Sequence, residues 1–149
     1  KKQATALAAK GIDVKVIDDA GLGKFLPTID IILLGCDIIM HETFISKSGA
    51  HLIAAAAKYY KIPVFVLADS RKILNKKYFP QSVLGTLIGK EEKPSDGIWK
   101  NPPQNIEVVF NHIEEVPNKL INKFILEKEA LTPHELIEKV DKVLVTNFF

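Results

Sequence analysis

Two short apolar runs, separated by a helical pattern, constrain the fold of this chain more than any other feature of its sequence. The first run is Ile29 to Leu34, which is apolar apart from Asp30, and the second is Pro63 to Leu67. Runs of this kind are typical of parallel strands that are covered on both faces. Between them, Ser48 is placed to cap a helix that continues to about Lys61. This β-α-β spacing predicts an α/β fold, a Rossmann-like, doubly wound, mostly parallel sheet with helices on both faces.

Further elements are expected on both sides of this unit. Before it, the pattern predicts a helix over Gln3 to Lys10 that stops at Gly11. A strand is expected next, over Ile12 to Ile17, because apolar and polar residues alternate there. After the unit, Glu107 to Phe110 has the pattern of a short strand, and Leu120 to Leu126 that of a helix or a strand.

The clearest local signal lies near the carboxyl end of the chain. Thr132 and Glu135 have the spacing of a capping box, and Pro133 stands at the first helical position between them. We therefore expect a helix that begins there and runs to about Val140.

We expect residues 1–149 to form a single domain, since 47% of the residues are hydrophobic and 26% are charged, which is typical of a packed globular chain. Residues 78–104 hold four of the eight prolines and three of the eight glycines, and they are expected to form a long excursion over the surface. The carboxyl end, Val143 to Phe149, is apolar and is expected to pack on the sheet or on a partner.

The sequence argues against two kinds of partner, nucleic acid and membranes. The net charge is only +2, from 20 basic and 18 acidic residues, and Arg71 is the only arginine. Direct contact with nucleic acid is therefore not expected, since it calls for clustered basic residues and especially arginine. No apolar run approaches the roughly 20 residues that span a bilayer, and no signal-peptide pattern is present, so we expect a cytoplasmic protein without membrane contact.

Neither a metal site nor a cofactor site is readable. Cys36 is the only cysteine and the four histidines have no ligand spacing. The stretch Gly21-Leu22-Gly23-Lys24 lacks the preceding glycine and the following serine or threonine of a phosphate-binding loop, so it is interpreted as a turn. We expect no cofactor.

The most informative segment is Leu34 to Ala50. Asp37 comes just after a predicted parallel strand, and Lys47, Ser48 and Gly49 stand at the start of the next helix. Ligands of open parallel sheets bind at this edge, where free helical amides favour an anion. A carboxylate and an ammonium placed there can transfer a proton on a sugar phosphate. The spacing also fits a plainer interpretation, in which Asp37 caps a turn and Lys47 is a solvated charge, and chemistry alone favours the plainer one.

The same segment resembles a known family. This family contains the alpha, beta and delta regulatory subunits of translation initiation factor 2B, together with methylthioribose-1-phosphate isomerase and ribose-1,5-bisphosphate isomerase. The matching stretches are Leu34-Gly35-Cys36-Asp37, Ser46-Lys47-Ser48-Gly49-Ala50, Pro63 to Ala68, Asp69-Ser70-Arg71-Lys72, Trp99 to Pro102, Asn111 to Pro117 and Leu131-Thr132-Pro133. They extend over nearly the whole chain, but they correspond only to the carboxyl-terminal domain of the family.

The resemblance implies roles for several residues. In the isomerases the aspartate at the position of Asp37 is the proposed acid/base, and the Asn-Lys pair at the positions of Ser46 and Lys47 contacts the sugar phosphate. The family's amino-terminal helical domain, catalytic cysteine and phosphate-binding arginines would lie upstream of Lys1. Cys36 stands at an alanine position of the motif, so it is not that catalytic cysteine.

Departures from the family pattern favour a regulatory member. Ser46 replaces asparagine, Ala50 replaces threonine, and His41-Glu42 stands where Asn-Gly or Asp-Gly is common. Serine lacks the amide donors of asparagine, and losing a bond made in the transition state costs on the order of tenfold to a thousandfold in rate.

Three functional hypotheses follow. The first is an alpha-like regulatory subunit of the factor 2B type. It would form a homodimer or a hetero-oligomer with related subunits, help assemble a guanine-nucleotide exchange complex that acts on initiation factor 2, and bind a sugar phosphate or nucleotide. The alternative is an aldose-ketose isomerase of a ribose 1-phosphate, with Asp37 as catalytic acid/base. The third is a scaffold whose site residues are only structural. The expected ligand-binding residues are Gly35, Asp37, Ser46, Lys47, Ser48 and Gly49.

Overall fold

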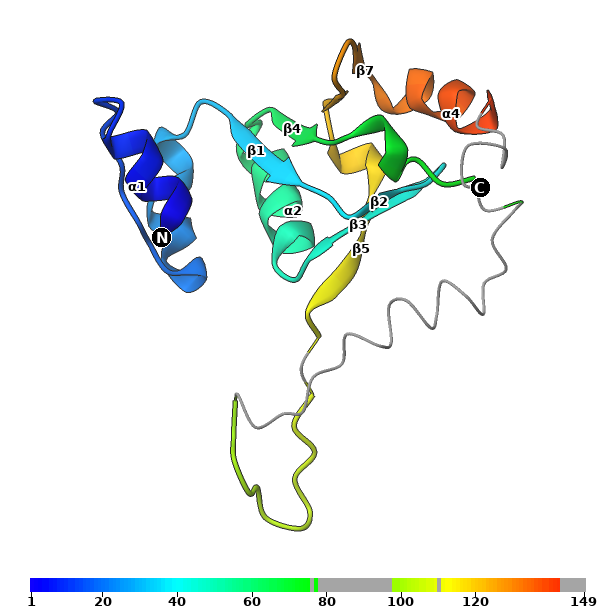
Figure 1. Ribbon diagram of the computed structural model, residues 1–149. Coiled ribbons are helices and arrows are strands. Elements are labelled where there is room, and N and C mark those ends of the chain that lie inside the picture. Colours follow the sequence, from blue (N-terminus) through cyan, green and yellow to red (C-terminus); the bar gives the residue numbers. More distant parts are fainter. Residues whose placement is uncertain (76, 78–97, 110, 143–149) are drawn as a thin grey trace.

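A computed structural model describes residues 1–75, 77, 98–109 and 111–142 (Figure 1). Its main sheet has the strand order β1-β4-β6-β7. Strands β1 (Ile32–Gly35), β4 (Val64–Leu67) and β6 (Lys123–Ile125) are parallel, and β7 (Ala130–Leu131) runs antiparallel to β6. The mostly parallel sheet with packed helices confirms the predicted α/β, Rossmann-like class.

A second, antiparallel sheet begins just after the carboxyl end of β1. It has the order β2-β3-β5, with β2 (Ile38–Ile39), β3 (Thr43–Lys47) and β5 (Ile113–Pro117). This antiparallel sheet was not among the elements predicted from the sequence. Its position matters for the site, because β3 carries part of the family motif into the turn before the next helix.

Helix α2 (Ala50–Tyr60) connects β3 to β4 and lies along β1 and β4 in Figure 1. Its buried residues are all alanines, whose small side chains let the helix lie close to the sheet. They share one core with alternate residues of the strands, including Val64 and Val66. Because side chains alternate across a strand, Leu33 and Leu67 point to the opposite face and are 56% and 46% exposed.

Helix α4 (Pro133–Lys142) packs beside β6 and β7 and buries Leu136 and Val140 (Figure 1). It begins as predicted, because Glu135 accepts hydrogen bonds from the backbone and side chain of Thr132, at 2.7 and 2.8 Å. The Glu135 amide in turn donates to the Thr132 hydroxyl at 3.3 Å. These reciprocal bonds lower the pKa of the Glu135 carboxyl, and the predicted capping box is confirmed.

The amino-terminal part differs from the prediction in one element. Helix α1 (Lys2–Ala8) is present, and Gly11 has the left-handed φ of 77° expected of a residue that ends a helix. The strand predicted over Ile12 to Ile17 is wrong, since this segment is exposed and pairs with no described strand. Without a neighbour, its alternating pattern has no face to bury. Two 3-10 turns follow, η1 (Asp19–Lys24) and η2 (Leu26–Thr28).

The later connections were predicted less well. The strand expected over Glu107 to Phe110 is wrong for its described residues 107–109, and the strand of this region begins at Ile113. The stretch Leu120 to Leu126 was predicted as a helix or a strand. It begins at the last residue of a 3-10 turn, η6 (Asn118–Leu120), and contains β6. Of the expected excursion, residues 98–104 have irregular backbone, whereas 78–97 lie outside the described residues, as does the apolar end 143–149.

Candidate functional site

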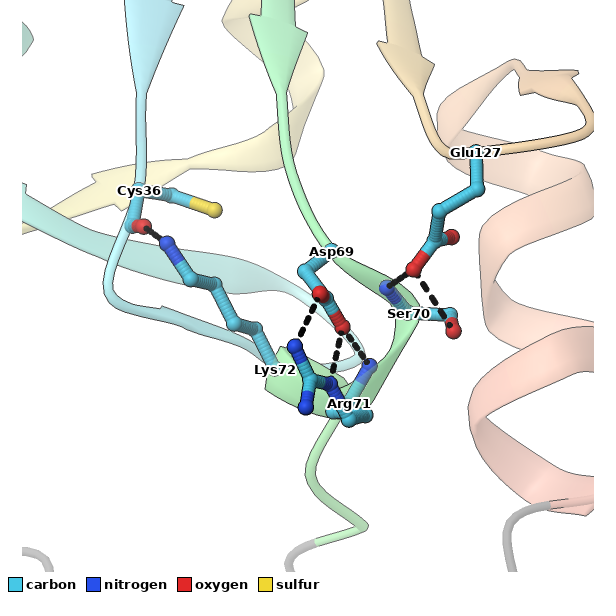
Figure 2. Close-up of polar contacts among 6 residues, drawn as sticks. All are labelled: Cys36, Asp69, Ser70, Arg71, Lys72 and Glu127. Atoms are coloured by element: carbon cyan, nitrogen blue, oxygen red, sulfur yellow. Dashed lines mark hydrogen bonds and ion pairs between the residues drawn. The ribbon is translucent and has the colours of Figure 1, made fainter.

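The carboxyl ends of the three parallel strands meet at one edge of the sheet, and polar residues follow each strand. Cys36 and Asp37 follow β1. The stretch Asp69 to Lys72 follows β4 and Glu127 comes two residues after β6, and Figure 2 draws them together with Cys36. Ligands of open parallel sheets bind at this edge. The segment singled out from the sequence therefore lies where the fold class places a site.

A pocket of about 340 Å³ opens at the end of β1, beside the start of α2. Five of the six expected ligand-binding residues line it. The sixth, Gly49, is the residue before α2 and does not line the pocket, although both of its neighbours do. The lining residues are Leu33, Leu34, Gly35, Cys36, Asp37, Ser46, Lys47, Ser48, Ala50 and Ile53.

Asp37 and Lys47 form the charged pair of this pocket. The Lys47 Nζ lies 3.3 Å from the Asp37 Oδ2, and the two side chains are 65% and 48% exposed. A pair this exposed contributes little to stability. The Asp37 amide donates to the Ile45 carbonyl at 2.8 Å, which ties the end of β1 to β3.

Ser46 points its hydroxyl into the protein. Its Oγ donates to the Gly35 carbonyl at 2.8 Å, and the residue is only 6% exposed. The hydroxyl proton is therefore used in a bond between β3 and the end of β1.

The turn before α2 is fastened to the start of β5. The Ser48 amide donates to the His112 carbonyl at 3.0 Å, and the Ser48 hydroxyl donates to the Asn111 carbonyl at 2.5 Å. The helix cap predicted at Ser48 is wrong, because Gly49 holds that position without a side-chain bond. Gly49 has a φ of 100°, a left-handed conformation that glycine adopts without strain.

The stretch after β4 forms a compact set of polar contacts (Figure 2). Both nitrogens of one edge of the Arg71 guanidinium bind the Asp69 carboxylate, Nε to Oδ1 at 2.8 Å and Nη2 to Oδ2 at 2.6 Å. The Arg71 amide donates to the same Oδ1 at 2.9 Å. These bonds hold the pKa of the Asp69 carboxyl well below its usual range and raise the pKa of Arg71.

Ser70 and Lys72 are also engaged within the protein (Figure 2). The Ser70 amide and hydroxyl donate to the Glu127 Oε1 at 3.0 and 3.2 Å. Hydrogen bonds from its own amide and from Ser70 lower the pKa of the Glu127 carboxyl. The Lys72 Nζ donates to the Cys36 carbonyl at 2.5 Å. The stretch that resembles the regulatory subunits thus joins the ends of β1, β4 and β6.

Two acidic residues near the site were missed by sequence reasoning. Glu127 follows the apolar run that forms β6, so its place after a parallel strand was the signal that could have found it. Glu114 accepts the His51 amide at 2.9 Å through its Oε1, across a separation of 63 residues. No local pattern in the sequence points to that bond.

The described residues contain neither a cluster of metal ligands nor a helix that could cross a membrane. Within them, no three His, Cys, Asp or Glu residues gather as a metal site would require. His41 instead binds Asp141, with 2.7 Å between Nε2 and Oδ1. No helix in the described part of the chain has the length and apolarity to cross a membrane.

Comparison with known proteins decides the family. The family model described as "Initiation factor 2 subunit family" matches residues 1–133. The chain belongs to this family. This confirms the resemblance drawn from the motifs around Asp37 and Lys47.

Relatives of the chain include both kinds of protein considered from the sequence, isomerases and subunits of the initiation factor. The chain is 29% identical over 144 residues to a ribose 1,5-bisphosphate isomerase of Pyrococcus furiosus, covering 93% of the chain and 43% of that protein. It is 28% identical to the translation initiation factor eIF2B subunit alpha of Dictyostelium discoideum, covering 95% of the chain and 46% of that protein. The fold is similar to the crystal structure of the translation initiation factor eIF-2B subunit delta from A. fulgidus, with a TM-score of 0.72 and 25% identity, covering 93% of the chain and 42% of the other.

The chain spans less than half the length of the curated relatives it matches. The match to the family model establishes membership of the initiation factor 2 subunit family. Because the chain covers only part of its relatives, the activity and partners of a whole protein belong to a proposal.

Proposed function

We propose that this chain is the Rossmann-like, carboxyl-terminal domain of an alpha-like regulatory subunit of the factor 2B type. In this proposal it binds a sugar phosphate or nucleotide, acts in the cytoplasm, and assembles with a second copy or with related subunits into a complex that exchanges guanine nucleotide on initiation factor 2. The observation that carries the regulatory choice is the hydrogen bond from Ser46 to the Gly35 carbonyl. Its hydroxyl proton is used inside the protein, where the isomerase pattern has an asparagine that contacts the substrate.

The pocket supports ligand binding even without catalysis. The Lys47 ammonium supplies positive charge for a phosphate, and the Asp37 carboxylate accepts hydrogen bonds from sugar hydroxyls. The pocket volume of about 340 Å³ falls at the small end of the range typical of small-molecule sites. A single phosphorylated sugar fits this size and charge.

An aldose-ketose isomerase is the second candidate. It is favoured by the fact that Asp37 and Lys47 both line the pocket, 3.3 Å apart, and by the similarity to a ribose 1,5-bisphosphate isomerase. In that reaction Asp37 would move the proton between neighbouring carbons, while Lys47 holds the phosphate. The internally bonded Ser46 leaves one substrate contact unmade, which argues for slow chemistry or none.

A phosphorus NMR time course on the protein in its full natural length separates the two. Ribose 1,5-bisphosphate and methylthioribose 1-phosphate are offered separately, and we expect both to persist unchanged while their resonances broaden on binding. Lys47→Gln should remove the broadening, because it deletes the cation that holds the phosphate.

Turnover that disappears in Asp37→Asn would overturn the regulatory proposal and establish the isomerase. Absence of both turnover and broadening, in a protein shown to be folded by its amide spectrum, would favour the third hypothesis, a scaffold whose site residues are only structural.

A further inference from the structure

Glu114 places a negative charge at the amino terminus of α2. Its Oε1 accepts the amide of His51, the second residue of the helix, at 2.9 Å. The amides of the first helical turn have no partner within the helix and carry part of the positive end of its dipole. The position where a phosphate would gain most from this helix is therefore already neutralised by a carboxylate of the protein.

The same carboxylate lies next to the pocket. In the β3–β5 ladder Glu114 is paired with Ser46, and such partners point to the same face with their Cβ atoms about 5 Å apart. Ser46 lines the pocket, and so does Ala50, the neighbour of His51. Glu114 does not itself line the pocket, but it is paired with one lining residue and binds the amide next to another. Its carboxylate adds negative charge to that of Asp37, against the ammonium groups of Lys47 and Lys72.

We propose that Glu114 is a specificity-determining residue that lowers the affinity of this pocket for a dianionic phosphate. The inference rests on the proposed function, since it concerns ligand choice at the same site. The attraction for an anion then comes from the ammonium groups of Lys47 and Lys72, and not from the helix terminus. A ligand that carries its charge at Lys47 and presents neutral hydroxyl groups toward α2 fits this arrangement better than one that places a phosphate on the helix.

The substitution Glu114→Gln tests the charge while keeping an acceptor for the His51 amide. Binding of ribose 1,5-bisphosphate and of inorganic phosphate is measured by titration calorimetry at pH 7.5, on the protein in its full natural length. We expect roughly fivefold tighter binding in the variant, the order of effect expected when one unit charge is removed near a dianion in a solvated site. The gain should shrink toward nothing in 0.5 M salt, because screening acts on charge and not on shape.

Glu138→Gln is the matched control. It removes the same charge from an exposed position of α4, a helix that supplies none of the lining residues of the pocket. Its affinity should stay within twofold of the natural protein. Equal gains in both variants would overturn the proposal, because they would reflect net charge alone.

Other outcomes are equally decisive. Unchanged or weaker binding by Glu114→Gln would overturn the inference and leave the proposed sugar-phosphate site in place. Binding by the variant but not by the natural protein would support the inference and contradict the proposed ligand. If neither binds, both are wrong. Glu114→Ala serves as a second variant, since it also removes the acceptor of the His51 amide and should lower the melting temperature more than Glu114→Gln does.

Discussion

At the scale of single residues, Cys36 shows how burial keeps a thiol unreactive. It is 5% exposed, and burial raises the pKa of the Cys36 thiol to about 11, against the opposing influence of the Lys72 ammonium. Only the thiolate is a strong nucleophile, so a thiol with this pKa is unreactive at neutral pH. The sequence-based exclusion of Cys36 as the family's catalytic cysteine agrees with this chemistry.

A pH dependence of stability follows from the same shift. The unfolded thiol ionises near pH 8.5 and the folded one near pH 11, so between these values only the unfolded chain gives up this proton. The free energy of unfolding should therefore fall as pH rises through this window, by on the order of 2 kcal/mol. Urea unfolding at pH 8 and pH 10.5 measures the fall. The Cys36→Ala variant is the control, because lysines and tyrosines also titrate in this pH range. An identical fall in the free energy of unfolding in both proteins would show that the Cys36 thiol is not its cause.

At the scale of elements, the capping box of α4 makes a measurable contribution to stability. Thr132→Ala removes the hydroxyl that donates to Glu135 and accepts from its amide. We expect a loss of about 1 kcal/mol in the free energy of unfolding, which is typical for removal of such a cap. Urea titration followed by circular dichroism measures it. Glu138→Gln in the same helix, at an exposed position, should change stability by less than half as much, and an equal loss would indicate a nonspecific effect of altering α4.

The capping box and the strands around α2 were predictable because their signals are local. The residues of the capping box lie within a span of four positions, and β1 and β4 are continuous apolar runs. Ile12 to Ile17 has an equally good strand pattern, yet a strand also needs a partner, which no local pattern guarantees. For the same reason the strand expected at Glu107 was placed too early, since β5 is defined by its pairing with β3.

The candidate site was likewise predictable only in its local features. Asp37 and Lys47 were found from their places after a strand and before a helix, and the structure brings them within 3.3 Å of each other. The bonds that commit Ser46 to Gly35 and Glu114 to His51 join distant parts of the chain, and only the fold shows them. The sequence therefore identified which residues surround the pocket, but not which of their donors and acceptors are already used.

At the scale of the whole molecule, the pocket is assembled from two sheets. The parallel sheet supplies Asp37 at the end of β1, and the antiparallel sheet supplies Lys47 from β3 and holds it in place through β5. Any change that loosens the β3–β5 ladder therefore moves the cation relative to the carboxylate.

The outer surface of α2 also bears on assembly. Leu52 and Tyr59 are seven residues apart on this helix, on the side away from the buried alanines, and they are 73% and 82% exposed. Large apolar residues grouped on one exposed face are typical of surfaces that bind another protein. Under the proposed function, the face is covered by a second copy or by a related subunit.

Sedimentation velocity on the protein in its full natural length tests this expectation. At micromolar concentration we expect a dimer or a larger species, and Leu52→Ser should weaken its association by about tenfold or more, since it removes an apolar side chain from the contact. Ile137→Ser is the control, because Ile137 is likewise apolar and 40% exposed but lies on α4. A protein that remains monomeric and loses stability with Leu52→Ser would show instead that its own chain covers this face, and the assembly proposal would then be wrong for α2.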